Sequence, residues 1–538
     1  MLTTLAAPAF AKEWYIEDGD ITVKASGTEG TNKVSQGANQ EVEDTDTIIT
    51  NRNEGTASSN TVTINAGNDK VEVTLKDVNI DTSSRNEAAM SVTGSGNTTI
   101  KLDGDNHLTG GNGIYSNSSG SLTISGGETD SLTAQGGDSR NGIYSVSGDV
   151  TISGGTVTAT GGNSTGSYGS GGDGIHSGSL TISGGTVTAT GGGSTGSNGL
   201  GGRGICSDSG GVTISGGTVK ATGGNGSDGG SGISSSSGVT VSDGTVTANG
   251  GNGGNVSGDG IRSDGGVTIS GGTVKAAGGD SKDGYGGDGI RSGGGVTISG
   301  NTVNAAGGNG GKVGGYGICS FDRVAISGGT VEAAGGSSGS SNGGSGIYSN
   351  DIDLSGSLEL TAKAGSPNGK ALSQKGSELD LDTIKDKLGP GAKVTATDAN
   401  GETKQVSIPR PVEPEGPVIP EESSSSSGGG SAAPSAPAFS LPGLTVTDKD
   451  GQHISYTSTQ SGNTLTVCVG RLTASFRISL AALRQLRAEG IETITFQTIL
   501  CSTTLSVDEL LAMGGEDAEV VLTHHIRSST LTVGGRAV

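Results

Sequence analysis

The sequence predicts an all-β fold, a right-handed parallel β-helix of about 11 coils with about 28 residues in each. The first observation is repetition: GGVTISGGTVKATGG at 210–224 recurs at 265–279 with one change. The second is alternation, since Val212 and Ile214 are separated by polar residues, as in a half-buried strand. The third is spacing. The central apolar residue of each VTIS-like segment recurs every 27 to 32 residues, at Ile124, Ile152, Ile182, Ile214, Val241, Ile269, Ile298 and Ile326.

Each repeat contains three short strand patterns, which read GIxS, VTIS and TVTA, and glycine pairs separate them. None of the three has a helical period, so three strands per turn with glycine corners describe one coil of a β-helix. We expect the doubled glycines to supply the positive φ of tight corners. We also expect the central isoleucines to stack in one interior column, and the coil to be right-handed, as parallel crossovers are.

Composition changes divide the chain into six segments. Residues 377–389 are expected to form a short helix, and two capped helices are expected at 479–490 and 506–515. The expected segments are a signal-peptide remnant (1–11), an N-terminal cap (12–70), the β-helix (71–370), a C-terminal cap (371–408), a Pro/Ser/Gly linker (409–442) and a small α/β domain (443–538).

Charge and composition exclude several classes of partner. The formal net charge of −22 disfavours nucleic acid and anionic membranes, and no apolar run is long enough to span a bilayer. Ala9-Phe10-Ala11 fits the cleavage site of a truncated secretory signal, which predicts an extracellular protein. Of the four cysteines, Cys206 and Cys319 occupy equivalent repeat positions. Pairing of Cys468 with Cys501 is left open, because sequence does not show their geometry.

The outward residue x of GIxS is the position where chemistry varies most between repeats. It is Tyr115, Tyr144, His176, Cys206, Ser234, Arg262, Arg291, Cys319 and Tyr348 in chain order. A solvated face without a ligand is one interpretation. The other is a sugar-binding surface, because tyrosine contacts sugar rings and arginine donates to hydroxyls and carboxylates. The predicted carbohydrate-binding residues are Tyr115, Tyr144, His176, Arg262, Arg291 and Tyr348.

A calcium site is also expected where GGDGIRS occurs in two consecutive coils. Asp259 and Asp288 should then lie one coil apart, and loop carbonyls with Asp280 or Asp283 would complete the oxygen ligands. The alternative is that each carboxylate pairs locally with an arginine or faces water.

Three passages carry a resemblance: VEVTLKDVNI at 71–80, NTTIKLDGDNHLTGGNGIYS at 97–116, and the recurring VTISGGTVTATGG. They resemble the bacterial carbohydrate-binding-domain proteins of Gram-positive cell surfaces, over about residues 60–370. The resemblance implies a pectate-lyase-like β-helix, and binding of acidic, plant-type polysaccharides and calcium. It assigns no ligand residue in this chain.

The expected function is therefore that of a secreted or cell-surface polysaccharide-binding protein, adhesin-like, monomeric and non-catalytic. The alternative of a polysaccharide lyase or hydrolase requires a convergent acid/base pair, which the uniform coils do not display. A passive stalk that displays the C-terminal domain is the third interpretation.

Overall fold

The computed structural model describes residues 12–409 apart from 54, and residues 444–537 apart from 448–453, 455, 462, 470–472, 499–501, 514–517, 525–528 and 535. The chain divides into two units, residues 1–414 and 415–538. The predicted signal remnant and nearly all of the predicted linker lie outside the described residues. No helix in the described part is long and apolar enough to cross a membrane.

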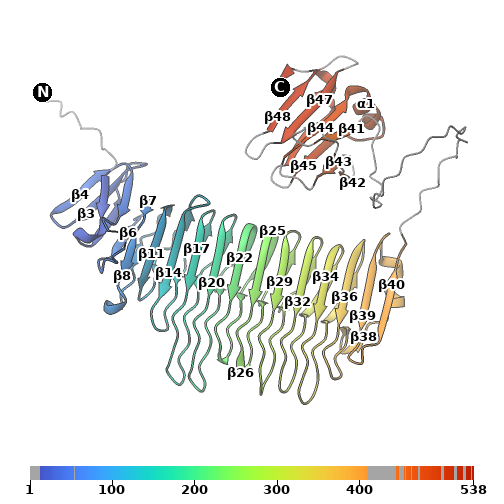
Figure 1. Cartoon of the computed structure of the whole chain (residues 1–538), viewed down its shortest axis with the longest axis horizontal. Coiled ribbons are helices and arrows are strands. Elements are labelled where there is room, and N and C mark those ends of the chain that lie inside the picture. Colours follow the sequence, from blue (N-terminus) through green and yellow to red (C-terminus); the bar gives the residue numbers. More distant parts are fainter. Residues whose placement is uncertain are drawn as a thin grey trace, which may run out of the picture. The chain divides into compact units, whose positions relative to one another are not determined.

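The first unit is a β-solenoid, which confirms the predicted fold class, and it has about 14 turns rather than about 11 (Figure 1). Each turn places one strand on each of three parallel faces, which we name after their repeat patterns. The GIxS face contains β2 (Ile21–Ala25), β6 (Val62–Asn65), β9 (Met90–Thr93), β12 (Ile114–Ser116), β15 (Ile143–Ser145), β18 (Ile175–Ser177), β21 (Ile205–Ser207), β24 (Ile233–Ser235), β27 (Ile261–Ser263), β30 (Ile290–Ser292), the first parts of β33 (Ile318–Ile326) and β35 (Ile347–Leu354), and β37 (Leu372–Gln374).

The other two faces follow the same order along the solenoid. The VTIS face contains β1 (Lys12–Tyr15), β5 (Thr47–Thr50), β7 (Val71–Lys76), β10 (Thr98–Asp103), β13 (Leu122–Ser125), β16 (Val150–Ile152), β19 (Leu180–Ile182), the first parts of β22 (Val212–Thr222) and β25 (Gly238–Asn249), β28 (Gly266–Ile269), β31 (Val296–Ile298), and the last parts of β33 and β35. The TVTA face contains β8 (Asn79–Asp81), β11 (Asp105–Gly110), β14 (Ser131–Gly136), β17 (Thr156–Thr160), β20 (Thr186–Thr190), the last parts of β22 and β25, β29 (Thr273–Ala277), β32 (Thr302–Ala306), β34 (Gly329–Ala334), β36 (Leu358–Lys363) and β39 (Lys393–Thr397).

The additional turns come from the segments expected to be caps. Strands β1, β5, β2 and β6 of residues 12–70 pair in parallel with later coils, although they lack the glycine pairs by which the repeat was recognised. Strands β3 (Asn32–Gln36) and β4 (Asn39–Asp44) form an antiparallel extension of β2. At the other end β40 (Thr403–Ser407) pairs antiparallel with β39. Antiparallel strands thus cover edges that would otherwise be open to other chains.

Short 3-10 helices and two minor strand pairs complete the solenoid. The expected helix at 377–389 is the 3-10 helix η3 (Leu381–Lys387), with Asp380 as its N-cap. The others are η1 (Ile16–Asp18) and η2 (Ser83–Arg85). Strand β38 (Ser377–Glu378) pairs with β37, and β23 (Gly226–Asp228) pairs with β26 (Gly253–Val256).

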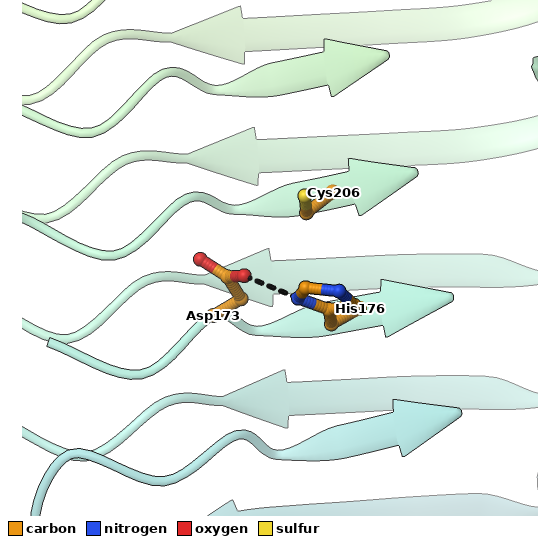
Figure 2. Close-up of side chains that lie close together, drawn as sticks. All are labelled: Asp173, His176 and Cys206. Atoms are coloured by element: carbon orange, nitrogen blue, oxygen red, sulfur yellow. Dashed lines mark hydrogen bonds and ion pairs between the residues drawn. The ribbon is translucent and has the colours of Figure 1, made fainter. Parts of the chain in front are cut away.

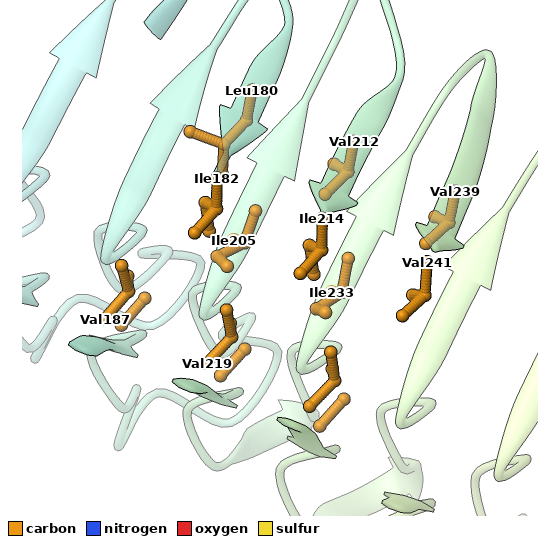
Figure 3. Packing of buried hydrophobic residues seen from close by; sticks show 14 of the residues in the cluster. Leu180, Ile182, Val187, Ile205, Val212, Ile214, Val219, Ile233, Val239 and Val241 are labelled. Atoms are coloured by element: carbon orange, nitrogen blue, oxygen red, sulfur yellow. The ribbon is translucent and has the colours of Figure 1, made fainter. Parts of the chain in front are cut away.

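The interior column of isoleucines is present as predicted. Ile182 faces Ile214 in the next coil, and Ile214 faces Val241, each with no exposed surface (Figure 3). The column extends without a break from Ile152 to Ile298. Identical side chains stack because every coil repeats the same register, so the core is a set of narrow columns.

Truncation of this column is expected to destabilise the solenoid strongly. Ile214→Ala should lower the free energy of unfolding by about 2–5 kcal/mol, because it leaves a cavity that stacked coils cannot close. Thr213→Ala on the exposed side of the same strand should change it by less than about 0.5 kcal/mol. Urea unfolding followed by far-UV circular dichroism measures both, and equal effects would contradict an interior column.

The two kinds of glycine pair have different roles. In most of the SGG pairs that follow a VTIS strand the second glycine has positive φ, for example +77° at Gly155 and +76° at Gly185, as expected for a corner. The TGG pairs lack positive φ, so the expectation of a corner is wrong for them. A Cβ on Gly161 would lie 2.0 Å from the carbonyl oxygen of Gly172. These glycines are required because two stretches of backbone touch.

This contact builds a projection that we call the flange, made of the loops that join each TVTA strand to the next GIxS strand, such as residues 161–174 (Figure 1). Its two limbs lie against each other: Gly172 N–H donates to the Gly162 carbonyl, and Gly192 N–H of the next coil donates to the Gly172 carbonyl, both at 2.8 Å. The same bonds continue through Gly202, Gly224, Gly230, Gly251, Gly258, Gly279, Gly287, Gly308, Gly315, Gly336, Gly344 and Gly365.

The second unit contains a five-stranded and a four-stranded sheet with two short helices, around a core that includes Phe476 and Phe496. Ser479 and Ser506 cap helices α1 (Leu480–Ala488) and α2 (Val507–Ala512), as expected. Cys468 is a free thiol, and Cys501, whose pairing with it the sequence leaves open, lies outside the described residues. The strands are β41 (Leu444–Thr447), β42 (Thr457–Ser461), β43 (Thr464–Cys468), β44 (Ala474–Ser479), β45 (Thr493–Gln497), β46 (Ser502–Ser506), β47 (Glu519–His524), β48 (Ser529–Val533) and β49 (Arg536–Ala537).

Candidate functional site

The variable GIxS positions form one continuous row along the solenoid. Tyr115 pairs with Tyr144, Tyr144 with His176, and the register continues to Tyr348 without a shift. We call this the inner row. Its exposure is uneven: Arg262 is exposed and the tyrosines are half-buried, whereas Cys206 and Cys319 are only 1% exposed.

A second row lies three residues earlier in each coil, and we call it the floor row. Its members are Asn112, Asn141, Asp173, Arg203, Ser231, Asp259, Asp288, Tyr316 and Ser345. All five Asn and Asp members bind the next coil in one way: for example, Asn141 Oδ1 accepts from the backbone N–H of Asp173, and Asp173 Oδ1 from that of Arg203, both at 2.6 Å. These side chains therefore fix the approach of the flange to the solenoid body.

A third row lies six residues before the inner row, on the flange, and we call it the outer row. Parallel bridges link its members from coil to coil, in the order Ser170, Leu200, Asp228, Val256, Tyr285, Val313 and Asn342. Leu200, Val256 and Tyr285 are 46%, 46% and 48% exposed, an unusual concentration of exposed apolar surface in this chain.

The inner and floor rows line hollows that follow one another along the solenoid, and the outer row joins them in the second and third hollows. A hollow of about 500 Å³ contains Tyr115, Arg140 and Tyr144 near the N-terminal end. The next, of about 420 Å³, runs from Ser170 to Arg262. The third, of about 520 Å³, extends past Arg291 to Tyr316 and shares Asp228, Ser231 and Arg262 with the second. We call the three hollows together the groove; they follow one another along the solenoid axis, and only the second and third share lining residues.

Arginine is concentrated in this groove. Four of the seven arginines in residues 12–409 line it: Arg140, Arg203, Arg262 and Arg291. Arg262 and Arg291 face each other across adjacent coils, as the sequence predicted. Arg291 Nη1 donates to Asp288 Oδ2 at 3.2 Å, while Arg262 makes no ion pair with any described residue.

Asp259 and Asp288 lie below these arginines and are 7% and 4% exposed. The carboxylate of Asp259 accepts from the N–H of Asp288 at 2.8 Å, and that of Asp288 accepts from the N–H of Tyr316 at 2.7 Å. Burial, followed by the charge of Asp259, raises the pKa of Asp288 to about 7. Burial likewise raises the pKa of Asp259.

The expected calcium ligands are only partly brought together. Asp259 and Asp288 are neighbours, but Asp280 belongs to a separate ladder on the other limb of the flange, where its Oδ1 accepts from the N–H of Asn309 at 2.6 Å. Asp283 is exposed and joins no group of three metal-binding side chains in the described residues. Calcium binding at the Asp259–Asp288 pair stays a prediction, and the local pairing of Asp288 with Arg291 is what the geometry shows.

The aromatic residues contact one another rather than standing apart. Ring centroids of Tyr115 and Tyr144 are 5.7 Å apart, and the rings of Tyr316 and Tyr348 are stacked at 4.9 Å with an interplanar angle of 19°. Stacking covers ring faces that the sequence analysis assigned to sugars. The exposed ring in the groove is instead Tyr285 of the outer row.

His176 lies at the centre of a polar cluster between the first two hollows (Figure 2). Its Nδ1 is 2.8 Å from Asp173 Oδ2, and its Nε2 is 2.8 Å from Asp208 Oδ2. The Cys206 thiol of the next coil lies 3.2 Å from Asp208 Oδ1 and 3.0 Å from Arg203 Nη1.

Electrostatics in this cluster favour the charged form of His176 and the protonated form of Cys206. Burial lowers the pKa of His176, but the bonds and charges of Asp173 and Asp208 outweigh it and raise that pKa above its ordinary value. Burial, together with the charge of Asp173, raises the pKa of Cys206 to about 12. A buried thiol in this state is not a nucleophile at neutral pH.

Sequence reasoning found the inner row and two members of the floor row, Asp259 and Asp288, but it missed the rest of the floor row and the whole outer row. Arg203, Asp208, Tyr285 and Tyr316 were not among the expected site residues. The available signal was that positions three and six residues before x also vary in chemistry between otherwise uniform coils. The chain matches no protein-family model, no curated protein and no solved structure. The resemblance to cell-surface carbohydrate-binding proteins therefore rests on the repeat motifs alone.

Proposed function

We propose that the solenoid binds an extended polysaccharide in the groove between the GIxS face and the flange. The observation that carries the proposal is the alignment of three hollows over successive coils. A linear polymer can contact equivalent positions of consecutive coils, whereas a compact ligand would use one hollow only. This extends the expected polysaccharide-binding role from a row of residues to a groove with two walls.

The chemistry of the central part suits a sugar acid. The guanidinium of Arg262 makes no ion pair with any residue that the structure describes, and Arg291 lies one coil away, so two adjacent uronate carboxylates or hydroxyls can each receive charged hydrogen bonds. Tyr285 supplies an exposed ring on the opposite wall. Asp228 lines the second and third hollows, and its buried Oδ1 has no hydrogen-bond partner among the described residues.

Binding without cleavage is part of the proposal. Both oxygens of Asp288 are engaged, by the N–H of Tyr316 and by Arg291, and Asp259 is held by the next coil. Neither carboxyl is poised at the surface as a general acid or base. We place the protein outside the cell, on a Gram-positive surface, where such polymers occur.

The test compares two double variants that remove equal charge. Arg262→Ala with Arg291→Ala should weaken binding of polygalacturonate by at least about tenfold, because two charge-assisted hydrogen bonds are lost. Lys220→Ala with Lys275→Ala, on exposed positions of the TVTA face, should leave the dissociation constant within about twofold. Isothermal titration calorimetry measures both, with the fully methyl-esterified polymer as an uncharged ligand.

Each other outcome identifies a different function. Equal effects of the two double variants would contradict recognition at the groove. Equal affinity for the esterified polymer would support binding in the groove, but it would show that the ligand is a neutral sugar and not a uronate. Absence of binding to any glycan would favour the passive stalk, and release of unsaturated oligosaccharides would favour a lyase.

A further inference from the structure

We infer that Asp173, His176 and Cys206 form a binding site for a transition-metal ion of the Zn²⁺ class, which is independent of polysaccharide binding. One atom from each of these side chains lies within 4.8 Å of the other two, and no other group of three His, Cys, Asp or Glu does so in the described residues. Figure 2 shows the three side chains on two adjacent coils and facing one another.

The donor types select the metal. A thiolate, an imidazole nitrogen and a carboxylate oxygen are the ligands that Zn²⁺ combines in tetrahedral sites. Calcium prefers six to eight oxygens, so this site is distinct from the calcium expected at Asp259 and Asp288. A fourth position would remain for water or for a ligand, because Asp173 also lines the second hollow of the groove.

Asp208 has the position of an orienting carboxylate. It lies 2.8 Å from His176 Nε2 and can accept a hydrogen bond from the N–H of that nitrogen, which leaves Nδ1, the nitrogen beside Asp173, to bind the ion. Metal-bound histidines commonly donate their second N–H to a carboxylate in this way. Binding requires that the Cys206 thiol, and the protonated form of His176 at Nδ1, release their protons to water as the bonds to the metal form.

The charges of the cluster balance when a divalent ion is present. A Cys206 thiolate, Asp173 and Asp208 carry three negative charges, and the ion with Arg203 carries three positive ones. Arg203 is already placed, with its Nη1 3.0 Å from the sulfur. In the neighbouring coils the inner row has Tyr144 and Ser234, so the metal-binding combination occurs only at this point of the repeat in the described chain.

The chain contains a matched control for this site. Cys319 occupies the inner row four coils later and is equally buried, but its row neighbours are Arg291 and Tyr348 instead of histidine. Cys319→Ser should therefore leave metal binding at the Cys206 site unchanged, while Cys206→Ser removes a ligand with a similarly small change of shape.

The experiment titrates the full chain with Co²⁺ and then displaces it with Zn²⁺. We expect a thiolate-to-cobalt charge-transfer band in the wild type and in Cys319→Ser that is lost in Cys206→Ser. Competition with a chromophoric chelator should show Zn²⁺ affinity reduced by more than about 100-fold in His176→Gln and by about 10- to 100-fold in Asp208→Asn.

Circular dichroism of each variant verifies that the solenoid is folded. A wild-type protein without a Cys206-dependent cobalt band would overturn the inference. So would Zn²⁺ affinity that His176→Gln leaves unchanged. Since the readouts contain no glycan, failure of the proposed polysaccharide binding would not affect them.

Discussion

Gly258→Ala is expected to lower the free energy of unfolding of the solenoid by at least about 3 kcal/mol. This is a larger loss than a substitution of an exposed residue usually causes. A Cβ at this position would lie 1.8 Å from the carbonyl oxygen of Gly230 in the preceding coil. The limb would have to move, which would break the bonds of Gly258 N–H to Gly251 and of Gly279 N–H to the Gly258 carbonyl, both 2.9 Å long. Thermal unfolding followed by circular dichroism measures the effect.

Gly254→Ala in the same flange loop is the control. The nearest atom to a Cβ there is 3.7 Å away, so the change in stability should be within about 0.5 kcal/mol. A similar loss for both variants would show that glycine acts through backbone conformation in the flange, and not through the contact between its limbs.

Asp288→Asn is expected to stabilise the protein above pH 7 by about 2 kcal/mol, because the cost of burying this carboxylate exceeds the gain from its bond to Arg291. Because the pKa of Asp288 is raised to about 7, the folded state binds a proton that the unfolded chain releases near pH 4. This contribution to stability is complete below about pH 4 and is lost as the pH rises to about 7. Asparagine keeps the acceptor for Tyr316 without the charge, as Asn141 does at the equivalent floor position.

The measurement is urea unfolding of the wild type and of Asp288→Asn at pH 4, 6 and 8. The difference between their free energies of unfolding should grow toward pH 8. Asp280→Asn is the control, because this exposed carboxylate makes the same kind of bond to the next coil. The expected calcium site would instead be supported if added Ca²⁺ made the wild type more stable toward pH 8. This effect should then be absent without Ca²⁺ and absent in the variant that lacks Asp288.

The parts of the fold that depend on period were predictable from the sequence. Alternation at Val212 and Ile214 placed their side chains inside, and the constant GIxS spacing placed Arg262 beside Arg291. Terminal turns were missed because β1 and β6 carry strand patterns without glycine pairs. Parallel pairing of those strands depends on tertiary contacts with later coils, which periodicity does not encode.

The groove was less predictable because its second wall arises from contact between loops. Gly161 and Gly172 are 11 residues apart, and nothing in their spacing shows that their backbones touch. The sequence alone does not show the flange, so it does not show which residues lie beside the floor row. Asp173 and Tyr285 are then recognisable only as loop residues. The composition of the loops, which is rich in glycine, was visible, but its steric meaning required the three-dimensional arrangement.

Hydroxyl-radical footprinting in the presence of polygalacturonate tests the proposed groove most directly. Tyr285 lines the groove and is 48% exposed, whereas Tyr15 lies on the VTIS face of the first strand and serves as an internal reference. The account predicts that the polymer protects Tyr285 from oxidation and leaves Tyr15 unchanged, and that the protection is lost with Arg262→Ala and Arg291→Ala. Polymer bound at saturating concentration without protection of Tyr285 would contradict it.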